Sequence, residues 1–125
     1  MIISPETQVR YIKLGRAGSW ERECIENGII RFGFGSANAD RFPLCQARQW
    51  DRLKQSFLAA GDPEGQATRF TNETRRFFED GGTTLWITFV GENLYWGFLT
   101  SDPPERHSDG HGVWRRVADG WRLMT

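Results

Sequence analysis

The chain has 125 residues, 38% hydrophobic and 26% charged, a composition typical of one globular domain rather than a disordered protein. Its 16 basic residues balance its 16 acidic ones, which argues against a protein that coats nucleic acid by electrostatics alone. No stretch approaches the roughly 18 apolar residues of a membrane-spanning helix, and no secretory signal is recognisable, so we expect a cytoplasmic protein.

The first third of the chain predicts a strand, a short helix and a second strand. Residues 9–14 alternate apolar and polar side chains, as a half-buried strand does. The glycine-rich turn at residues 15–18 ends this strand, and Ser19 then supplies a good N-cap for a helix. Gly28 is a natural C-terminal stop for that helix, and residues 29–34 predict the second strand.

The rest of the chain predicts two longer helices and two hairpins. These are a loop at 35–45, helices at 46–60 and 67–79, a hairpin of 83–90 with 94–100, a polar loop at 101–112, and a hairpin of 113–117 with 121–124. Apolar side chains recur at helical spacing in the predicted helices, and β-branched and aromatic residues fill the first hairpin. The pattern predicts a single α+β domain over residues 1–125.

Tryptophan and arginine are both unusually frequent. Six tryptophans are more than the core of a small domain needs, because each buried indole brings an N–H that must find a partner. We therefore expect one or two of them at a surface pocket. Lys13 and Lys54 are the only lysines, so arginine carries nearly all positive charge, and its guanidinium binds phosphate and stacks on rings. Genomic base composition is the alternative explanation for this bias.

The turn at residues 15–18 is the first candidate ligand site. A strand that feeds a helix N-terminus through Gly15 and Gly18 leaves backbone N–H groups free beside Arg16 and Trp20. Phosphate and a flat base complement these groups, since a base stacked on an aromatic side chain contributes roughly 1–3 kcal/mol. The alternative is a turn selected for its geometry alone, with Trp20 as a hydrophobic lid.

Trp86 and Trp96 lie on the two facing strands of the first predicted hairpin. Alternation places Trp86 on the face shared by Thr84 and Thr88. On the other strand, it places Tyr95 and Trp96 on opposite faces. We therefore expect one aromatic of each pair in the core and the other pointing outward or at the mouth of a barrel.

His107, Asp109 and His111 form the one combination with the spacing of a metal site. On a strand, their alternate positions would place three ligands on one face. Prolines and glycines flank the segment, however, so a solvated loop is the better prediction. No nucleophile motif is present, and the spacing of Cys24 and Cys45 fits no zinc pattern. We expect no metal, cofactor or catalytic residue, and a small metal-dependent hydrolase or nuclease is the least favoured alternative.

Two segments together resemble one known superfamily. The order YIKLGRAGSWERECIENGIIRFGF, then helices, then GGTTLWITFVGENLYWGFLT, is similar to the PUA-like superfamily, and above all to its EVE and YTH branches. Similar modules stand at the N-terminus of bacterial modification-dependent restriction and defence proteins. The matching features are the strand with Tyr11-Ile12-Lys13, the helix and return strand after it, and the pattern Tyr95-Trp96-Gly97-Phe98 on the hairpin.

The resemblance implies a small twisted, mixed β-barrel flanked by three helices, which takes a flipped or unpaired nucleotide into an aromatic pocket. Together with the turn and the hairpin, it gives two sets of expected contacts. The expected base pocket consists of Trp20, Phe34, Trp96, Trp86 and Ser19. The expected phosphate contacts come from Lys13, Gly15, Arg16, Gly18, Arg69, Arg75 and Arg76.

The leading hypothesis is a non-enzymatic reader of a modified base, for which DNA is favoured and RNA is the alternative, and which directs an effector nuclease or ATPase domain or subunit to its target. The alternative is a protein–protein interaction or regulatory domain whose aromatic face docks a partner chain. No membrane partner is expected. The chain ends on a predicted strand, as a fragment of a longer protein would.

Overall fold

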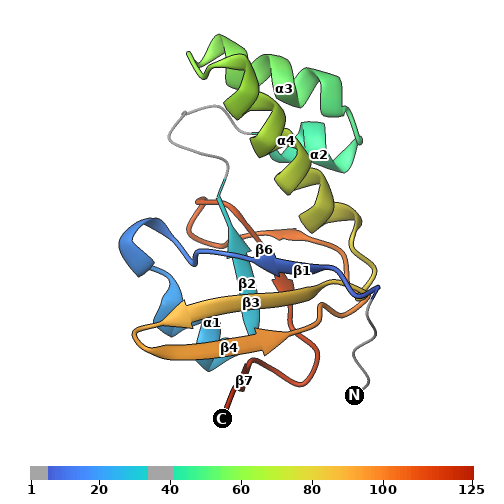
Figure 1. Cartoon of the computed structure of the whole chain (residues 1–125). Coiled ribbons are helices and arrows are strands. Elements are labelled where there is room, and N and C mark those ends of the chain that lie inside the picture. The colour runs from blue at the N-terminus through green and yellow to red at the C-terminus, as the bar shows by residue number, and fades with distance from the viewer. Residues whose placement is uncertain (1–5, 34–40) are drawn as a thin grey trace.

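The computed structural model describes residues 6–33 and 41–125, which form the predicted α+β fold (Figure 1). One sheet has the strand order β1-β3-β4-β7, with β1 parallel to β3 and the other pairs antiparallel. The second sheet is antiparallel, in the order β2-β6-β5. The strands are β1 Val9–Tyr11, β2 Ile29–Phe32, β3 Leu85–Val90, β4 Asn93–Gly97, β5 Glu105–Arg106, β6 Val113–Arg116 and β7 Arg122–Leu123. The helices are α1 Glu21–Asn27, α2 Phe42–Gln46, α3 Trp50–Ala59 and α4 Glu64–Glu79, and a 3-10 turn, η1, covers Arg16–Gly18.

The main hydrophobic core lies between the two sheets. Trp86 of β3 is buried there with Ile12, which follows β1. Ile30 of β2 and Val113 of β6 close the core from the second sheet, and both are fully buried. Each of these residues lies in a segment that the sequence predicted to be a strand.

Helices α2, α3 and α4 gather at one end of the sheets and enclose a second, smaller core (Figure 1). Leu53 and Phe57 of α3 pack there with Ala67 of α4. Phe78 of α4 packs against both cores, and its neighbour Phe77 is fully buried in the main one. Helix α4 thus joins the helical end to the sheets.

A buried arginine fixes the C-terminal end of α4 to the second sheet. Arg115 of β6 is only 3% exposed. Its guanidinium donates to the carbonyl oxygens of Phe77 at 2.8 Å, Asp80 at 2.6 Å and Thr100 at 2.9 Å. Hydrogen bonds to buried carbonyl groups are costly to break, so the position of α4 is set by these bonds as well as by apolar packing.

The predicted second hairpin is wrong. Strand β6 pairs with β2 and β5, whereas β7 pairs with β4 in the other sheet. Between them, Asp119 and Gly120 have positive φ angles of 61° and 76°, and the chain crosses there from one sheet to the other. Turn residues show that the chain reverses, but they do not show which strand the next segment joins. Strand β5 lies in the segment predicted to be a polar loop.

The helices also differ from the prediction in two places. The described residues hold four α-helices rather than three, because the short α2 forms inside the predicted loop, with Pro43 in its first turn. Proline is well tolerated there, since the first helical N–H groups have no partner within the helix. Helix α1 begins later than expected: its N-cap is Trp20, with no side-chain capping bond, so Ser19 is not the cap. Gly28 ends α1 in the left-handed conformation, as predicted.

The two sheets are joined at one side by an isolated bridge between Leu99 and Val117. The described strands form two sheets and do not close into a barrel. None of the helices in the described ranges combines the length and the apolar character that crossing a bilayer requires.

Candidate functional site

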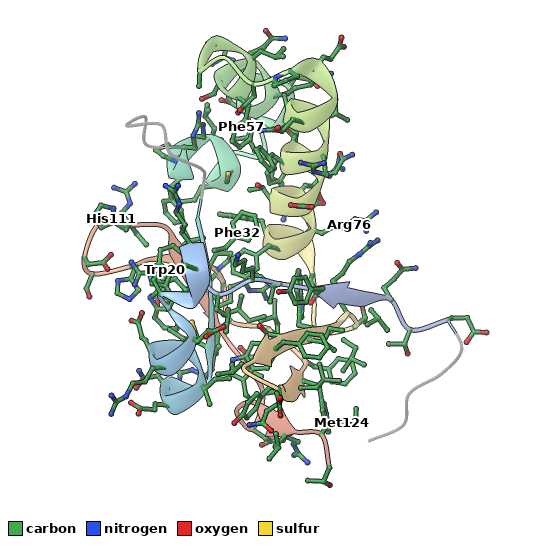
Figure 2. All side chains as sticks on the ribbon, turned by 60° about the vertical axis from the view of Figure 1, so that its left-hand side comes forward. Trp20, Phe32, Phe57, Arg76, His111 and Met124 are labelled. Carbon is green, nitrogen blue, oxygen red and sulfur yellow. The ribbon has the colours of Figure 1, made fainter. Side chains whose placement is uncertain are left out.

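A cleft of about 820 Å³ lies between strand β1 and helix α4. This volume falls within the roughly 300–1,000 Å³ typical of small-ligand sites. One wall is formed by Val9–Tyr11 and the two residues after it, and the end of β2 contributes Phe32 and Gly33. In Figure 2, Phe32 and Arg76 lie where the lower end of α4 meets the sheets.

The other wall is one face of α4. Its lining residues recur three and four positions apart, as residues on one side of a helix do. The exposed ones are Gly65, Thr68, Arg69, Asn72, Glu73 and Arg76, and the more deeply placed Phe70 and Thr74 also line the cleft. At 1.5 Å of rise per residue, this face is about 16 Å long, which is long enough for a ligand larger than a single ring.

The cleft is strongly basic in a chain without net charge. Arg10, Lys13, Arg69 and Arg76 line it, and Glu73 is the one acidic residue among its lining residues. Within the described residues, none of these four cations forms an ion pair. A concave surface of one sign concentrates its field and attracts ligands of the opposite charge. The cleft therefore favours an anion.

Arg10 adds an unsatisfied hydrogen-bond donor. Its Nη2 donates to Gln8 Oε1 at 3.2 Å, but its Nε is buried and has no hydrogen-bond partner in the described structure. Buried donors in proteins are nearly always paired. An acceptor atom of a ligand in the cleft would satisfy this group.

Aromatic rings line the same cleft. Tyr11 is 57% exposed, whereas Phe32 is half-buried and stacks on Phe77 with a centroid distance of 5.1 Å. Phe70 is half-buried beneath Arg69, whose Cζ lies 5.4 Å from the ring centre. Tyr11 therefore offers the most accessible flat surface in this cleft.

Four of the residues predicted as contacts meet here: Lys13, Arg69, Arg76 and Trp86. Trp86 is only 4% exposed, and its indole N–H donates to Asp80 Oδ2 at 3.0 Å, so it forms the floor rather than a free stacking surface. Sequence reasoning missed Arg10 and Tyr11. Their alternation on β1 was visible, but the helix that faces them is more than 50 residues away in the sequence.

Four of the N–H groups that the sequence predicted to be free in the glycine turn and directly after it are used within the chain. The N–H groups of Gly15, Gly18, Ser19 and Trp20 donate to carbonyl groups within the turn or just before it, at 3.0–3.2 Å. Gly15 has a φ of 82°, and a β-carbon there would lie 2.5 Å from the Ser19 hydroxyl oxygen. The glycines are thus explained by the geometry of the turn. Arg16 is exposed and lies outside the cleft.

The three tryptophans of the predicted base pocket are separated. Trp86 is directly opposite Gly97, and Trp96 is directly opposite Ile87, so Trp86 and Trp96 lie on opposite faces of their sheet. Trp20 packs against the same core as Trp86, but its ring is covered by the guanidinium of Arg31, which lies 4.0 Å from the ring centre. The structure therefore does not bring these indoles together.

One further predicted contact, Arg75, does not line the cleft. Arg75 projects from another side of α4, where it forms an ion pair with Glu79 and lies 5.9 Å from the ring of Trp50. Phe34 lies outside the described residues.

The loop that carries His107, Asp109 and His111, here called the histidine loop, is part of a polar network around Arg31. The buried guanidinium of Arg31 donates to Glu23 Oε1 at 2.8 Å, to Asp109 Oδ2, and to the carbonyl oxygen of His111 at 2.9 Å. Glu23 and Asp109 both also contact His107. Among the described residues, no group of three His, Cys, Asp or Glu side chains is placed to hold a metal ion. The carboxylates of Glu23 and Asp109 bind Arg31 and His107 instead.

This network lowers the pKa of both carboxyl groups. Burial acts to raise the pKa of Glu23, but the hydrogen bonds with His107 and Arg31 outweigh it, so the net pKa is below its ordinary value of 4.5. Burial also acts to raise the pKa of Asp109, and the His111 N–H and Arg31 bring it below 3.8. Both carboxylates are therefore charged at neutral pH and serve to hold the loop.

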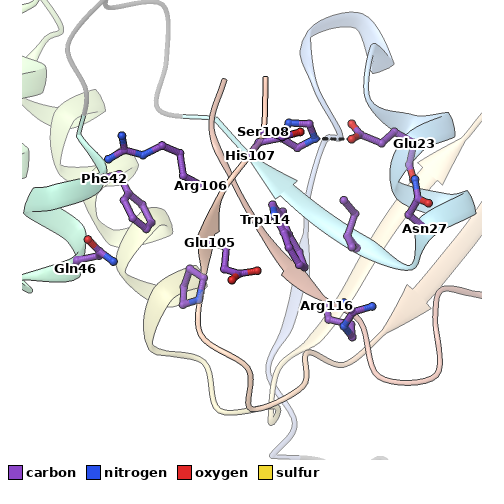
Figure 3. A pocket seen from close by; sticks show the side chains of 12 residues that line it. Glu23, Asn27, Phe42, Gln46, Glu105, Arg106, His107, Ser108, Trp114 and Arg116 are labelled. Atoms are coloured by element: carbon purple, nitrogen blue, oxygen red, sulfur yellow. Dashed lines mark hydrogen bonds and ion pairs between the residues drawn. The ribbon is translucent and has the colours of Figure 1, made fainter. Parts of the chain in front are cut away.

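A second hollow of about 760 Å³ lies on the three-stranded sheet (Figure 3). Trp114 lies in its middle, and Arg106, Arg116 and Glu105 surround it. The side chain of His107 at its rim is tied to Glu23 (Figure 3). Cations and carboxylates are mixed here, so this hollow has no preference for an anion like that of the cleft.

Three comparisons with known proteins gave no match to this chain. A scan against protein-family models finds no matching family, and searches of the curated proteins and the solved structures find no significant match to the chain.

Proposed function

We propose that this chain binds nucleic acid without catalysing a reaction, and that the cleft between β1 and α4 receives an unpaired or flipped base with its neighbouring phosphates. The observation that carries this proposal is the meeting of Arg10, Lys13, Arg69 and Arg76 in one concave site, where none of them forms an ion pair with a described residue. A free anionic ligand would supply the missing charges.

The chemistry of the walls fits a nucleotide. Arginine donates two parallel hydrogen bonds to a phosphate, and the buried Arg10 Nε awaits an acceptor. Tyr11 offers a ring for stacking. Asn72 and Glu73 on the facing side of α4 offer a carboxamide and a carboxylate for the edge of a base. Phosphates would thus position the strand, and the base edge would provide selectivity.

The finer parts of the proposal rest on the resemblance to the PUA-like superfamily. We propose a modified base in DNA as the preferred ligand, and an effector nuclease or ATPase as the partner that this recognition serves. The two joined sheets would then correspond to the barrel of that superfamily.

Fluorescence anisotropy with labelled single-stranded oligonucleotides at low salt tests the proposal. DNA and RNA of the same sequence are compared, with and without one methylated base in the middle. An Arg69→Gln, Arg76→Gln double variant should bind about tenfold more weakly or worse, since a hydrogen bond to a charged group contributes about 1.5–3 kcal/mol.

Arg75→Gln is the matched control, because Arg75 lies on another side of the same helix and is paired with Glu79. Its affinity should equal that of the wild-type chain. Negligible binding of every oligonucleotide by the wild-type chain would overturn the proposal, and equal affinity for plain and methylated strands would overturn the preference for a modified base.

A further inference from the structure

The outer face of the four-stranded sheet presents aromatic and apolar side chains to solvent. The strand register aligns Tyr11, Ile87, Trp96 and Arg122 in one row across the sheet. Two contacts agree with this alignment. The rings of Tyr11 and Phe89 have centroids 6.2 Å apart, and the Arg122 Cζ lies 5.5 Å from the ring centre of Trp96.

Exposed apolar side chains are concentrated on this sheet. Of the large hydrophobic residues exposed in the described ranges, Val9, Tyr11 and Phe89 lie on this face, whereas Leu123 of β7 faces the other side of the sheet. Half of Phe89 is exposed. In Figure 1 no helix crosses the near face of this sheet. A contiguous apolar surface of this kind on a small domain marks a binding site.

The charges of the face are cationic. None of the outward residues of β1, β3, β4 and β7 is a carboxylate, whereas Lys13 follows β1 and Arg122 ends the row beside Trp96. Rings combined with cations fit a single nucleic-acid strand, whose bases stack on the rings while its phosphates contact the cations. An apolar protein partner would leave Lys13 unused, and Arg122 would keep only its exposed ion pair with Asp119 at 3.4 Å.

The face also continues the cleft. Tyr11 lines the cleft and begins the aromatic row of the outer face. Two strand spacings separate Tyr11 from Trp96, which is about 10 Å. About three stacking steps of roughly 3.4 Å between successive bases span this distance. A strand whose central base enters the cleft could thus place its next bases on this row.

We infer that the outer sheet face binds the nucleotides that flank the base in the cleft, with Tyr11, Phe89 and Trp96 as stacking surfaces and Arg122 as a phosphate contact. This inference rests on the proposed function and extends it to a face outside the cleft. It makes the binding site several nucleotides long.

Anisotropy with two oligonucleotides that share the same central base, one of four and one of ten nucleotides, tests the inference. Phe89→Ala and Trp96→Ala should each weaken binding of the longer strand about fivefold or more, the loss expected for one stacked base. Binding of the four-nucleotide strand should not change. Phe89 is half exposed and Trp96 is only partly buried, so neither belongs to the buried core. Thermal unfolding of each variant checks that it is folded.

Leu123→Ala is the matched control, because Leu123 is an exposed apolar residue of the same sheet that is opposite Tyr95 and faces the other side. Unchanged binding of the longer strand by Phe89→Ala and Trp96→Ala, with weakened binding by the Arg69→Gln, Arg76→Gln variant, would overturn the inference and leave the proposed function standing. A wild-type dimer that Phe89→Asp converts to a monomer, with oligonucleotide binding unaltered, would also overturn it. Failure of the wild-type chain to bind any strand would remove the proposed function itself.

Discussion

The guanidinium of Arg31 lies 4.0 Å from the centre of the Trp20 ring while it donates to carboxylates from two other parts of the chain. Arg31 itself is 3% exposed. One side chain thus covers the indole that the sequence assigned to a base pocket and ties α1, β2 and the histidine loop together. Trp20 is best understood as part of the structural framework.

Replacing Arg31 should strongly destabilise the fold. Arg31→Met leaves Glu23 and Asp109 without their cation, and removal of one partner from a buried ion pair costs about 3–5 kcal/mol. Because both carboxylates are partly exposed, we expect the lower end of that range. Urea unfolding measures it. Arg22→Ala, which removes an exposed ion pair with Glu26, should cost less than about 1 kcal/mol, and equal losses would contradict this account.

The same network should make stability depend on acid. The pKa values of Glu23 and Asp109 are lower in the folded chain than their ordinary values of 4.5 and 3.8. Their stabilisation is complete above those ordinary values and is lost as the pH falls below them, because the unfolded chain binds protons first. The urea midpoint should therefore fall from pH 6 to pH 3. A Glu23→Gln variant should show a shallower decline, and an unaltered slope would argue against the network.

Cys24 should be unreactive in the folded protein. Burial raises the pKa of its thiol to about 12, so almost none of it is thiolate at neutral pH. Cys45 is also buried. We expect a thiol reagent to modify neither cysteine in native buffer and both in denaturant. Rapid modification of Cys24 without denaturant would show that α1 opens readily.

Salt should weaken nucleic-acid binding in proportion to the cations of the cleft. For a single strand, the slope of log affinity against log salt changes by about 0.7 for each phosphate contact. Removal of Arg69 and Arg76 together should therefore reduce the steepness by about 1.4. Titrations at several salt concentrations measure it, with Arg75→Gln expected to keep the wild-type slope.

Local features of the fold could be predicted from the sequence. Gly28 was correctly identified as the end of α1, and β1 to β4 overlap the segments that were predicted to be strands. Pairing between distant segments could not be predicted in this way. The partner of β7 depends on which sheet edge is free, and the carboxylate partner Asp109 of Arg31 is 78 residues away.

The candidate site was predictable only in part. Lys13, Arg69 and Arg76 were expected to contact phosphate, and their meeting in one cleft depends on how α4 packs against the sheets. The expected cluster of Trp20, Trp86 and Trp96 did not form. The register of β3 and β4 separates Trp86 from Trp96, and that register follows from the hairpin turn, which alternation along each strand does not specify.

Phe78 and Arg115 together fix the position of α4, which forms one wall of the cleft. Phe78 anchors α4 to both cores, and Arg115 holds the last turn of α4 through backbone carbonyl groups. The two walls of the cleft are therefore kept at a constant separation before any ligand arrives. If a nucleic-acid strand enters as proposed, little conformational freedom would be lost, and binding would be close to rigid-body docking.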